Sequence, residues 1–292
     1  MDIPARMIQR ILPLAIPKCF GVHIGMTADT PRGTNRNLPA AFGGGAIIGT
    51  LGGLIGLGGA EFRLPLLIGL FRFRALQAII LNKAISLVVI ASALPFRAAT
   101  VPFADIVAHW PIILNLLAGS LLGAWIGAGW ATRLQSRTLH KVLAVLMVGI
   151  AAVLLVGHDV SASHVPMNET ARVLAGICAG FLIGSVASLM GVAGGELLIP
   201  TLVVMFGVDI KLAGSMSLVI SLPTVMIGFA RYSRDQSFKV LAQNRSFLLV
   251  MAAGSILGVF LGGLMLALAP QTVLIPALAA LLVLSAIKVW PR

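Results

Sequence analysis

The chain has 292 residues, of which 59% are hydrophobic and only 10% are charged. A soluble domain carries about 25% charged residues, so this composition excludes an ordinary soluble domain and predicts an all-α polytopic membrane protein. The formal charge of +12 does not require a nucleic-acid partner, because Lys and Arg collect in the cytoplasmic loops of membrane proteins. The two cysteines, Cys19 and Cys178, cannot form a disulfide framework.

Residues 1–38 precede the first long apolar run and contain five Arg or Lys residues. Their apolar patch at 11–17 is short and broken by proline, and no small-residue cleavage site follows it closely. We therefore interpret them as a cytoplasmic N-terminal tail rather than a signal peptide. We expect three further parts: a first transmembrane repeat at 39–157, an external linker at 158–171 and a second transmembrane repeat at 172–292.

Each repeat contains five apolar segments. In chain order, these cover 39–59, 62–71, 75–96, 110–132 and 142–157 in the first repeat, and 173–194, 197–208, 212–230, 246–269 and 272–287 in the second. Several match the roughly 20 residues that a helix needs to cross a bilayer. The second segment of each repeat is too short to cross alone.

Two pairs of matching stretches indicate the duplication. GLGGAEFRLP at 56–65 matches GVAGGELLIP at 191–200, and the glycines of 116–130 recur within 250–264. Both pairs are separated by the same offset along the chain. We expect the second pair only to pack helices, because its glycines have the small-xxx-small spacing of close helix contacts.

Between these matches, we expect the register of the two repeats to differ. The stretch from Pro65 to Ser86 is longer than the stretch from Pro200 to Ser217. The excess is about one helical turn, so we expect one extra turn in the first repeat.

Loop charges predict that the repeats are inverted. Loop 133–141 contains three basic residues and its counterpart near 270–271 contains none, whereas loop 231–245 contains four and its counterpart 97–109 contains one. Because basic loops remain in the cytoplasm, equivalent loops then lie on opposite sides of the membrane, with both termini cytoplasmic. Inverted repeats of this kind are common in secondary transporters.

The same orientation predicts a re-entrant hairpin in each repeat. The chain is cytoplasmic at 1–38 and cytoplasmic again at Arg72 and Arg74, so the first two apolar segments must enter and return on one side. Each repeat would then consist of a broken helical hairpin plus three transmembrane helices. The glycine-rich turns would form the hairpin tips near the middle of the membrane, where unwound backbone is tolerated only inside protein or beside a cavity.

The hairpin tips have the chemistry of an anion site. Helices that begin near Phe62 and Leu197 would direct free N–H groups and positive dipole ends at a ligand. Pro65 and Pro200 are expected structural residues of the first helical turn, where a missing N–H is least harmful. The candidate substrate-binding residues are Gly56, Gly58, Gly59, Arg63, Asn82, Lys83, Ser86, Gly191, Gly194, Gly195 and Ser217.

The third apolar segment of each repeat carries a polar stripe. Asn82 and Ser86 share one helix face in the first repeat, with Lys83 beside them, and the second repeat aligns Ser217, Ser221 and Thr224. We expect both stripes to face the hairpins.

The charged residues each have an alternative role. Arg63 could extend to the outer interface or pair with Glu61, and Lys83 could extend to the cytoplasmic face, instead of binding an anion. Glu61 and Glu196 could cap their own helices or carry a coupling proton. They could also bind a metal cation in a cation carrier, although two carboxylates make a poor cage for one.

Other function classes lack the residues that they need. The spans contain no HExxH sequence or Ser–His arrangement, and all five histidines lie in the tail or loops. We therefore expect no catalytic residue, no metal site and no cofactor. No ATP-binding motif is present, so an ion gradient, the substrate gradient or a partner subunit would drive transport.

With GLGGAEFRLP and GVAGGELLIPTLVVMFGV in equivalent positions, the chain resembles the sulfite exporter TauE/SafE family over about residues 40–290. The family's motif positions correspond to Gly56, Gly59, Pro65, Gly191, Gly194, Gly195, Glu196, Pro200 and Ser217. The first repeat departs from the family pattern at Arg63, at Lys83 and through the expected extra turn. The resemblance implies a bacterial inner-membrane permease for small sulfur oxyanions or organosulfonates, such as sulfite, sulfoacetate or thiosulfate.

Overall fold

The computed structural model describes residues 37–55, 59–98, 103–157 and 168–265, together with positions 283, 286 and 287. All regular secondary structure in these residues is helical. The expected N-terminal tail and most of the last apolar segment, 272–287, lie outside the described residues. Gly56 and Gly58 also lie outside them.

The helices follow the apolar segments closely. In the first half they are α2 (Leu38–Ile55), α3 (Ala60–Gly69), α4 (Ala75–Ala98), α5 (Phe103–Ala108), α6 (Trp110–Arg133) and α7 (Ser136–Gly157). In the second half they are α8 (Glu169–Met190), α9 (Gly195–Phe206), α10 (Ile210–Tyr232), the 3-10 helix η2 (Gln236–Phe238), α11 (Lys239–Gln243) and α12 (Arg245–Met265). The short helices α5, η2 and α11 were not predicted.

Five of the described helices contain a stretch that is long and apolar enough to cross a membrane. These stretches are Ala75–Ala93, Trp110–Arg133, Glu169–Met190, Leu212–Tyr232 and Arg245–Gly262. Large apolar side chains such as Leu122, Leu182 and Leu249 are exposed on their surfaces, which is the pattern expected of helices in contact with lipid. The prediction of an all-α polytopic membrane protein is confirmed.

The helix positions contradict the extra turn expected in the first repeat. The starts of α3 and α9, of α4 and α10, and of α6 and α12 are all separated by one and the same offset. The register is therefore constant, and Ser86 corresponds to Ser221 rather than to Ser217. The residue equivalent to Ser217 is Asn82. The prediction was wrong because it aligned two serines that occupy different turns of their helices.

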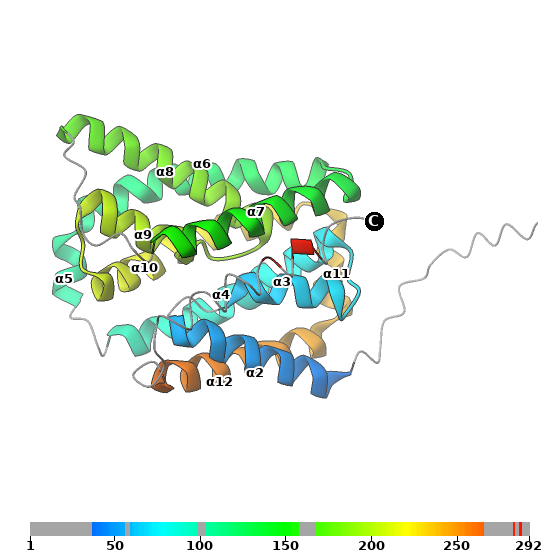
Figure 1. The fold of residues 1–292 in the computed structure, drawn as a ribbon. Helices are drawn as coiled ribbons and strands as arrows, with labels where there is room; N and C mark the ends of the chain where they lie inside the picture. The colour runs from blue at the N-terminus through cyan, green and yellow to red at the C-terminus, as the bar shows by residue number, and fades with distance from the viewer. Residues whose placement is uncertain are drawn as a thin grey trace, which may run out of the picture. The chain divides into compact units, whose positions relative to one another are not determined.

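The first helix of each half packs against the helix formed by the fourth apolar segment of the other half. α2 lies along α12, and α8 lies along α6 (Figure 1). Backbones meet at the glycines: a Cβ on Gly123 of α6 would collide with the carbonyl oxygen of Phe181, and a Cβ on Gly258 of α12 would collide with that of Ala46. Ala46 and Phe181 are equivalent positions of the two halves, so the same contact is made twice. The expected packing role of these glycines is confirmed.

The predicted cytoplasmic loops gather at one end of the helices. Phe71 and Phe73, in the turn after α3, pack on the ring of Phe247 at the start of α12, with centroid distances of 4.8 and 5.4 Å. The guanidinium groups of Arg231 and Arg234 lie 5.5 and 5.1 Å from the centroid of a Trp125 ring, in the C-terminal half of α6. Leu139 shares one buried cluster with Phe73 and Phe247, so the basic segments 72–74, 133–141 and 231–245 lie at the same end.

The turn after α9 lies near the start of α6 instead. Val208 is buried in one apolar cluster with Ile106 of α5 and Ile113 near the start of α6. α6 therefore runs from the vicinity of this turn toward Arg231, and the equivalent turn after α3 lies beyond the far end, beside Phe247.

Candidate functional site

The two glycine-rich turns have the same backbone geometry. Gly59 precedes α3 with φ of 70°, and Gly194 precedes α9 with φ of 86°. Both values lie in the left-handed region, where a residue with a Cβ is strained. Space is short as well: a Cβ on Gly59 would collide with the carbonyl oxygen of Ile48, and one on Gly194 would approach Ile183 and Ala187 side chains to 3.2 Å. These positions require glycine.

Gly191 ends the preceding helix in the same way. It caps α8 with φ of 69°, and a Cβ there would collide with the carbonyl oxygen of Ile79 on α4. The second glycine-rich turn therefore lies directly against α4, a helix of the other half.

The helices after the turns begin two residues earlier than predicted. The first helical hydrogen bond of α3 joins the N–H of Arg63 to the carbonyl oxygen of Gly59, and Leu198 bonds Gly194 equivalently in α9. The N–H groups of Ala60, Glu61 and Phe62 precede the first helical bond, so the helix itself offers them no acceptor.

The early start places both prolines beyond the first turn. Pro65 is the sixth residue of α3, and Pro200 is the sixth residue of α9. The expected first-turn position is therefore wrong. Because proline has no N–H, the carbonyl oxygens of Glu61 and Glu196 lose the hydrogen bond that a helix would normally supply.

Arg63 is fully buried and points toward α4. Its Nη1 atom donates to Oδ1 of Asn82 at 3.3 Å and to Oγ of Ser86 at 3.5 Å. It does not extend to the surface, so that alternative is wrong. The expectation that the stripe of Asn82 and Ser86 faces the first hairpin is confirmed.

Asn82 brings the two glycine-rich motifs together. Its Nδ2 atom donates to the carbonyl oxygen of Ala60 at 2.9 Å and to that of Met190 at 3.4 Å. Ala60 begins the helix after the first turn, and Met190 immediately precedes the second turn. Asn82 therefore bonds both glycine-rich motifs, and it also accepts the hydrogen bond that orients Arg63.

Glu61 and Glu196 form a buried pair of carboxyl groups. Their side chains are 1% and 2% exposed, and they are close enough for a protonated carboxyl of one to donate to the other. No other donor among the described residues has hydrogen-bonding geometry to any of their four oxygens. The guanidinium of Arg63 lies near enough to Glu61 for electrostatic attraction. The backbone N–H of each residue lies near its own carboxyl, so the capping role and the proton-carrying role both stay predictions.

Lys83 is fully buried and points toward the end of α8. Its Nζ atom donates to Oγ of Ser188 at 3.0 Å and to the carbonyl oxygen of Ala187 at 3.5 Å. A cation is stabilised at the negative end of a helix dipole. The alternative that Lys83 extends to the cytoplasmic face is wrong.

The polar stripe on α10 differs from the expectation. Ser217 donates to the carbonyl oxygen of Gly214 in its own helix, and Thr224 faces Ser120 of α6 at 2.8 Å. Ser221 is buried without a hydrogen-bond partner among the described residues. The counterpart of Arg63 in the second half is Leu198, which has no donor to offer. Ser86 and Ser221 are equivalent positions, but only Ser86 has a hydrogen-bond partner, because only the first half has an arginine at the facing position.

Two residues around Lys83 were not identified from the sequence. The hydroxyl of Tyr232 donates to the carbonyl oxygen of Ser188 at 2.8 Å, so it joins Lys83 at the end of α8. A Cβ on Gly228 would lie 2.7 Å from Nζ of Lys83, so this glycine makes room for the lysine. The single tyrosine of the chain was the one available clue.

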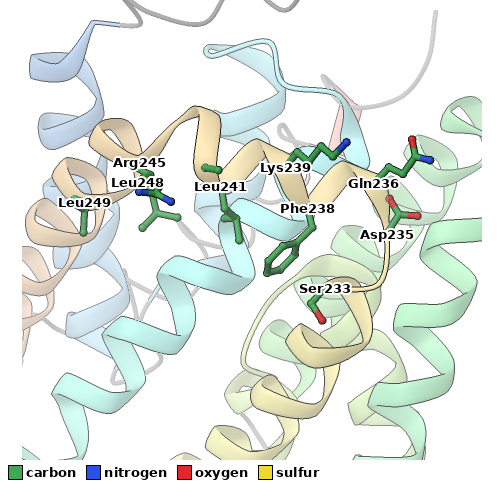
Figure 2. A pocket seen from close by; sticks show the side chains of 10 residues that line it. Ser233, Asp235, Gln236, Phe238, Lys239, Leu241, Arg245, Leu248 and Leu249 are labelled. Atoms are coloured by element: carbon green, nitrogen blue, oxygen red, sulfur yellow. The ribbon is translucent and has the colours of Figure 1, made fainter.

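A surface hollow lies apart from these buried charged residues. This hollow has a volume of about 640 Å³. Figure 2 shows its lining side chains, which come from the residues around η2, α11 and the start of α12. Phe238, Lys239 and Arg245 are among its lining residues, and none of the buried charged residues is. It is therefore separate from the centre around Arg63. Among the described residues, no third His, Cys, Asp or Glu joins Glu61 and Glu196 to form a possible metal-binding group.

The fold and the buried centre define a multi-pass α-helical membrane protein in which four charged side chains of the described residues, Glu61, Arg63, Lys83 and Glu196, are buried between two similar halves. The sequence model of one family, Sulfite exporter TauE/SafE, matches residues 7–154 and 40–289. The chain belongs to this family of membrane transport proteins, which confirms the resemblance noted in the sequence. No curated protein and no solved structure matches the chain.

Proposed function

We propose that the protein is a secondary permease for small anions, namely sulfur oxyanions or organosulfonates such as sulfite. The observation that carries this proposal is the position of Arg63: a fully buried guanidinium, oriented by Asn82, at the beginning of α3. A buried cation in a membrane protein is energetically unfavourable and is a functional-site candidate by default.

The surrounding backbone favours the same type of ligand. α3 and α9 both begin at a glycine turn, and the first N–H groups of a helix attract anions. A guanidinium presents several donors in one plane and can bind two oxygens of an oxyanion at once. We propose that the anion binds between Arg63 and the starts of α3 and α9. Gly56, Gly58, Gly59, Gly191, Gly194 and Gly195 would allow close approach of backbone.

Side chains of the third helices would complete the site. Asn82 and Ser86 already contact Arg63, and we propose that they and Ser217 bind the anion by hydrogen bonds. Lys83 would attract the anion by its positive charge from a distance, because its Nζ atom already donates to Ser188 at the end of α8.

The permease would expose this centre alternately to the two sides of the membrane. Arg63 and Lys83 are 0% exposed, so the conformation described here is closed around them. We propose that the two halves are inverted repeats and that their glycine turns enter from opposite sides. The separate locations of the turns after α3 and α9 support this proposal.

The bacterial inner membrane is the proposed location, with cytoplasmic N- and C-termini. Support comes from the gathering of segments 72–74, 133–141 and 231–245 at one end of the helices, since basic segments remain in the cytoplasm. We propose a proton gradient as the driving force.

Flux measurements test the proposal. Purified protein in liposomes would be supplied with sulfite, thiosulfate, sulfate or small organosulfonates, and uptake of each would be compared with that of protein-free liposomes. We expect flux of at least one of these anions, reduced at least about tenfold by Arg63→Leu, because a charge-assisted hydrogen bond contributes about 1.5–3 kcal/mol.

Arg137→Leu is the matched control, because Arg137 is exposed at the start of α7. It should leave flux unchanged. Absence of flux for every anion, or equal flux in wild type and Arg63→Leu, would contradict the proposed function.

A further inference from the structure

We propose that Glu61 and Glu196 act as one proton-binding unit, which holds a shared proton when the anion site is empty and takes up a second proton when an anion binds. This inference rests on the proposed function, because it explains how the same buried centre couples proton and anion transport.

The geometry of the carboxyl pair carries the inference. Glu61 belongs to the first turn of α3 and Glu196 to the first turn of α9, so each half contributes one group at equivalent positions. Both are almost completely buried and adjoin each other, and the backbone N–H of each residue lies near its own carboxyl. No other side-chain donor among the described residues bonds their oxygens. A hydrogen bond from a carboxylic acid to a carboxylate satisfies both groups, and such bonds are short and strong.

The charges that face the pair fix its favoured proton content. Arg63, on α3, is the positive group next to Glu61. Lys83, on α4, directs its charge toward Ala187 and Ser188 of α8 instead. No other charged side chain is buried in the described part of the chain. A pair with one shared proton carries one negative charge, which the charge of Arg63 compensates.

Arrival of an anion changes this balance. A monovalent anion on Arg63 takes over the role of counterion, and the remaining negative charge of the pair is then uncompensated in a buried environment, which is unfavourable. Uptake of one proton from water forms an O–H bond on the second carboxyl and makes the pair neutral. When the anion leaves, the same O–H bond breaks and the proton returns to water. Anion and proton therefore favour each other's binding.

The first experiment measures the ratio of protons to anions. Liposomes containing the protein and an internal pH-sensitive dye would receive a gradient of methanesulfonate, a monovalent anion that does not titrate near neutral pH. We expect about one proton per anion for the wild type and for Glu169→Gln, a control at an exposed carboxyl at the start of α8. Each single variant, Glu61→Gln or Glu196→Gln, still has one carboxylate to compensate Arg63 and should keep a ratio near one, whereas the double variant Glu61→Gln/Glu196→Gln should lower the ratio to about zero. A ratio near one in the double variant would overturn the proposal.

The second experiment does not depend on transport. Infrared spectroscopy of the purified protein near neutral pH should show the C=O stretch of a protonated carboxylic acid in the wild type and in Glu169→Gln. The band should be absent from the double variant Glu61→Gln/Glu196→Gln. If the wild type lacks the band, or the double variant retains it, the shared proton is refuted even where anion flux is normal. If the band behaves as expected but no anion is transported, the proposed function fails and the carboxyl pair stands.

Discussion

Asn82 donates a hydrogen bond from Nδ2 to the carbonyl oxygen of Met190, 3.4 Å away, and thereby connects α4 of one half to the end of α8 in the other. The same side chain bonds Ala60 and Arg63. Asn82 therefore connects α4 to both α3 and α8, so its replacement should affect both stability and transport.

Asn82→Ala should destabilise the protein and reduce anion flux. The change leaves two buried carbonyl oxygens without this donor and leaves Arg63 without the acceptor that orients it, and a buried group that loses its partner costs about 1–3 kcal/mol. Asn82→Ser, which introduces the residue found at the equivalent position 217, should retain part of the function. Thermal unfolding in detergent and flux in liposomes measure the two effects. Wild-type stability and flux in Asn82→Ala would show that the connection is unimportant.

Gly194→Ala should destabilise the protein by about 1–2 kcal/mol or more, because the added Cβ would be forced into a left-handed backbone conformation. The Cβ would also press against Ile183 and Ala187. Gly43→Ala is the matched control, since a Cβ at this position on α2 meets nothing within 4 Å. It should be neutral or stabilising, because alanine favours a helix over glycine. Equal unfolding midpoints for the two variants would argue against the special geometry of the turn.

Lys83→Met and Tyr232→Phe should have non-additive effects on stability. Both side chains donate to polar groups at the end of α8, with Ser188 as the shared partner. Residues in one hydrogen-bond network commonly differ from additivity by about 0.5 kcal/mol or more. The measurement is the unfolding free energy of wild type, both single variants and the double variant. Strict additivity would show that the two groups act independently. The control is the pair Lys83→Met and Ser92→Ala. The Ser92 hydroxyl, near the end of α4, bonds only its own helix, so the effects of these two changes should add.

Accessibility to a membrane-impermeant thiol reagent should place Arg74 and Arg234 on the same side of the membrane. Single Cys substitutions at these exposed positions, in a protein lacking Cys19 and Cys178, should react from one side only. A Cys replacing Glu169 should react only from the opposite side. The expected result follows from the packing of Phe73 on Phe247 and of Arg234 on Trp125 at one end of the helices. Reaction of the Arg74 and Arg234 positions from opposite sides would contradict the inverted repeats.

The sequence predicted the helices, the duplication and the approach of Asn82 and Ser86 to the first hairpin. These features depend on apolar length, on glycine spacing and on residues of one helix face, all of which are local properties. The register between repeats was mispredicted because Pro65 and Pro200 are equivalent whereas Ser86 and Ser217 are not. Only the common starts of α4 and α10 reveal the correct pairing.

The partners of Lys83 and of the two glutamates could not be predicted. Lys83 follows Asn82 immediately, yet it contacts Ser188 near the end of α8, while Asn82 bonds Ala60 and Met190 beside the two glycine-rich turns. Adjacent residues on a helix point about 100° apart, and what each one meets depends on helices that are distant in the chain. The contact between Glu61 and Glu196 depends in the same way on how the two halves are assembled.

The exchange of helix partners, α2 with α12 and α6 with α8, has a consequence for biosynthesis. When residues 39–157 have left the ribosome, α2 still lacks the surface on which its glycines fit, and α6 still lacks α8. The first half must therefore remain incomplete in the membrane until the second has been inserted. Two separately expressed polypeptides, divided within the 158–167 connection, should accumulate only when they are produced together.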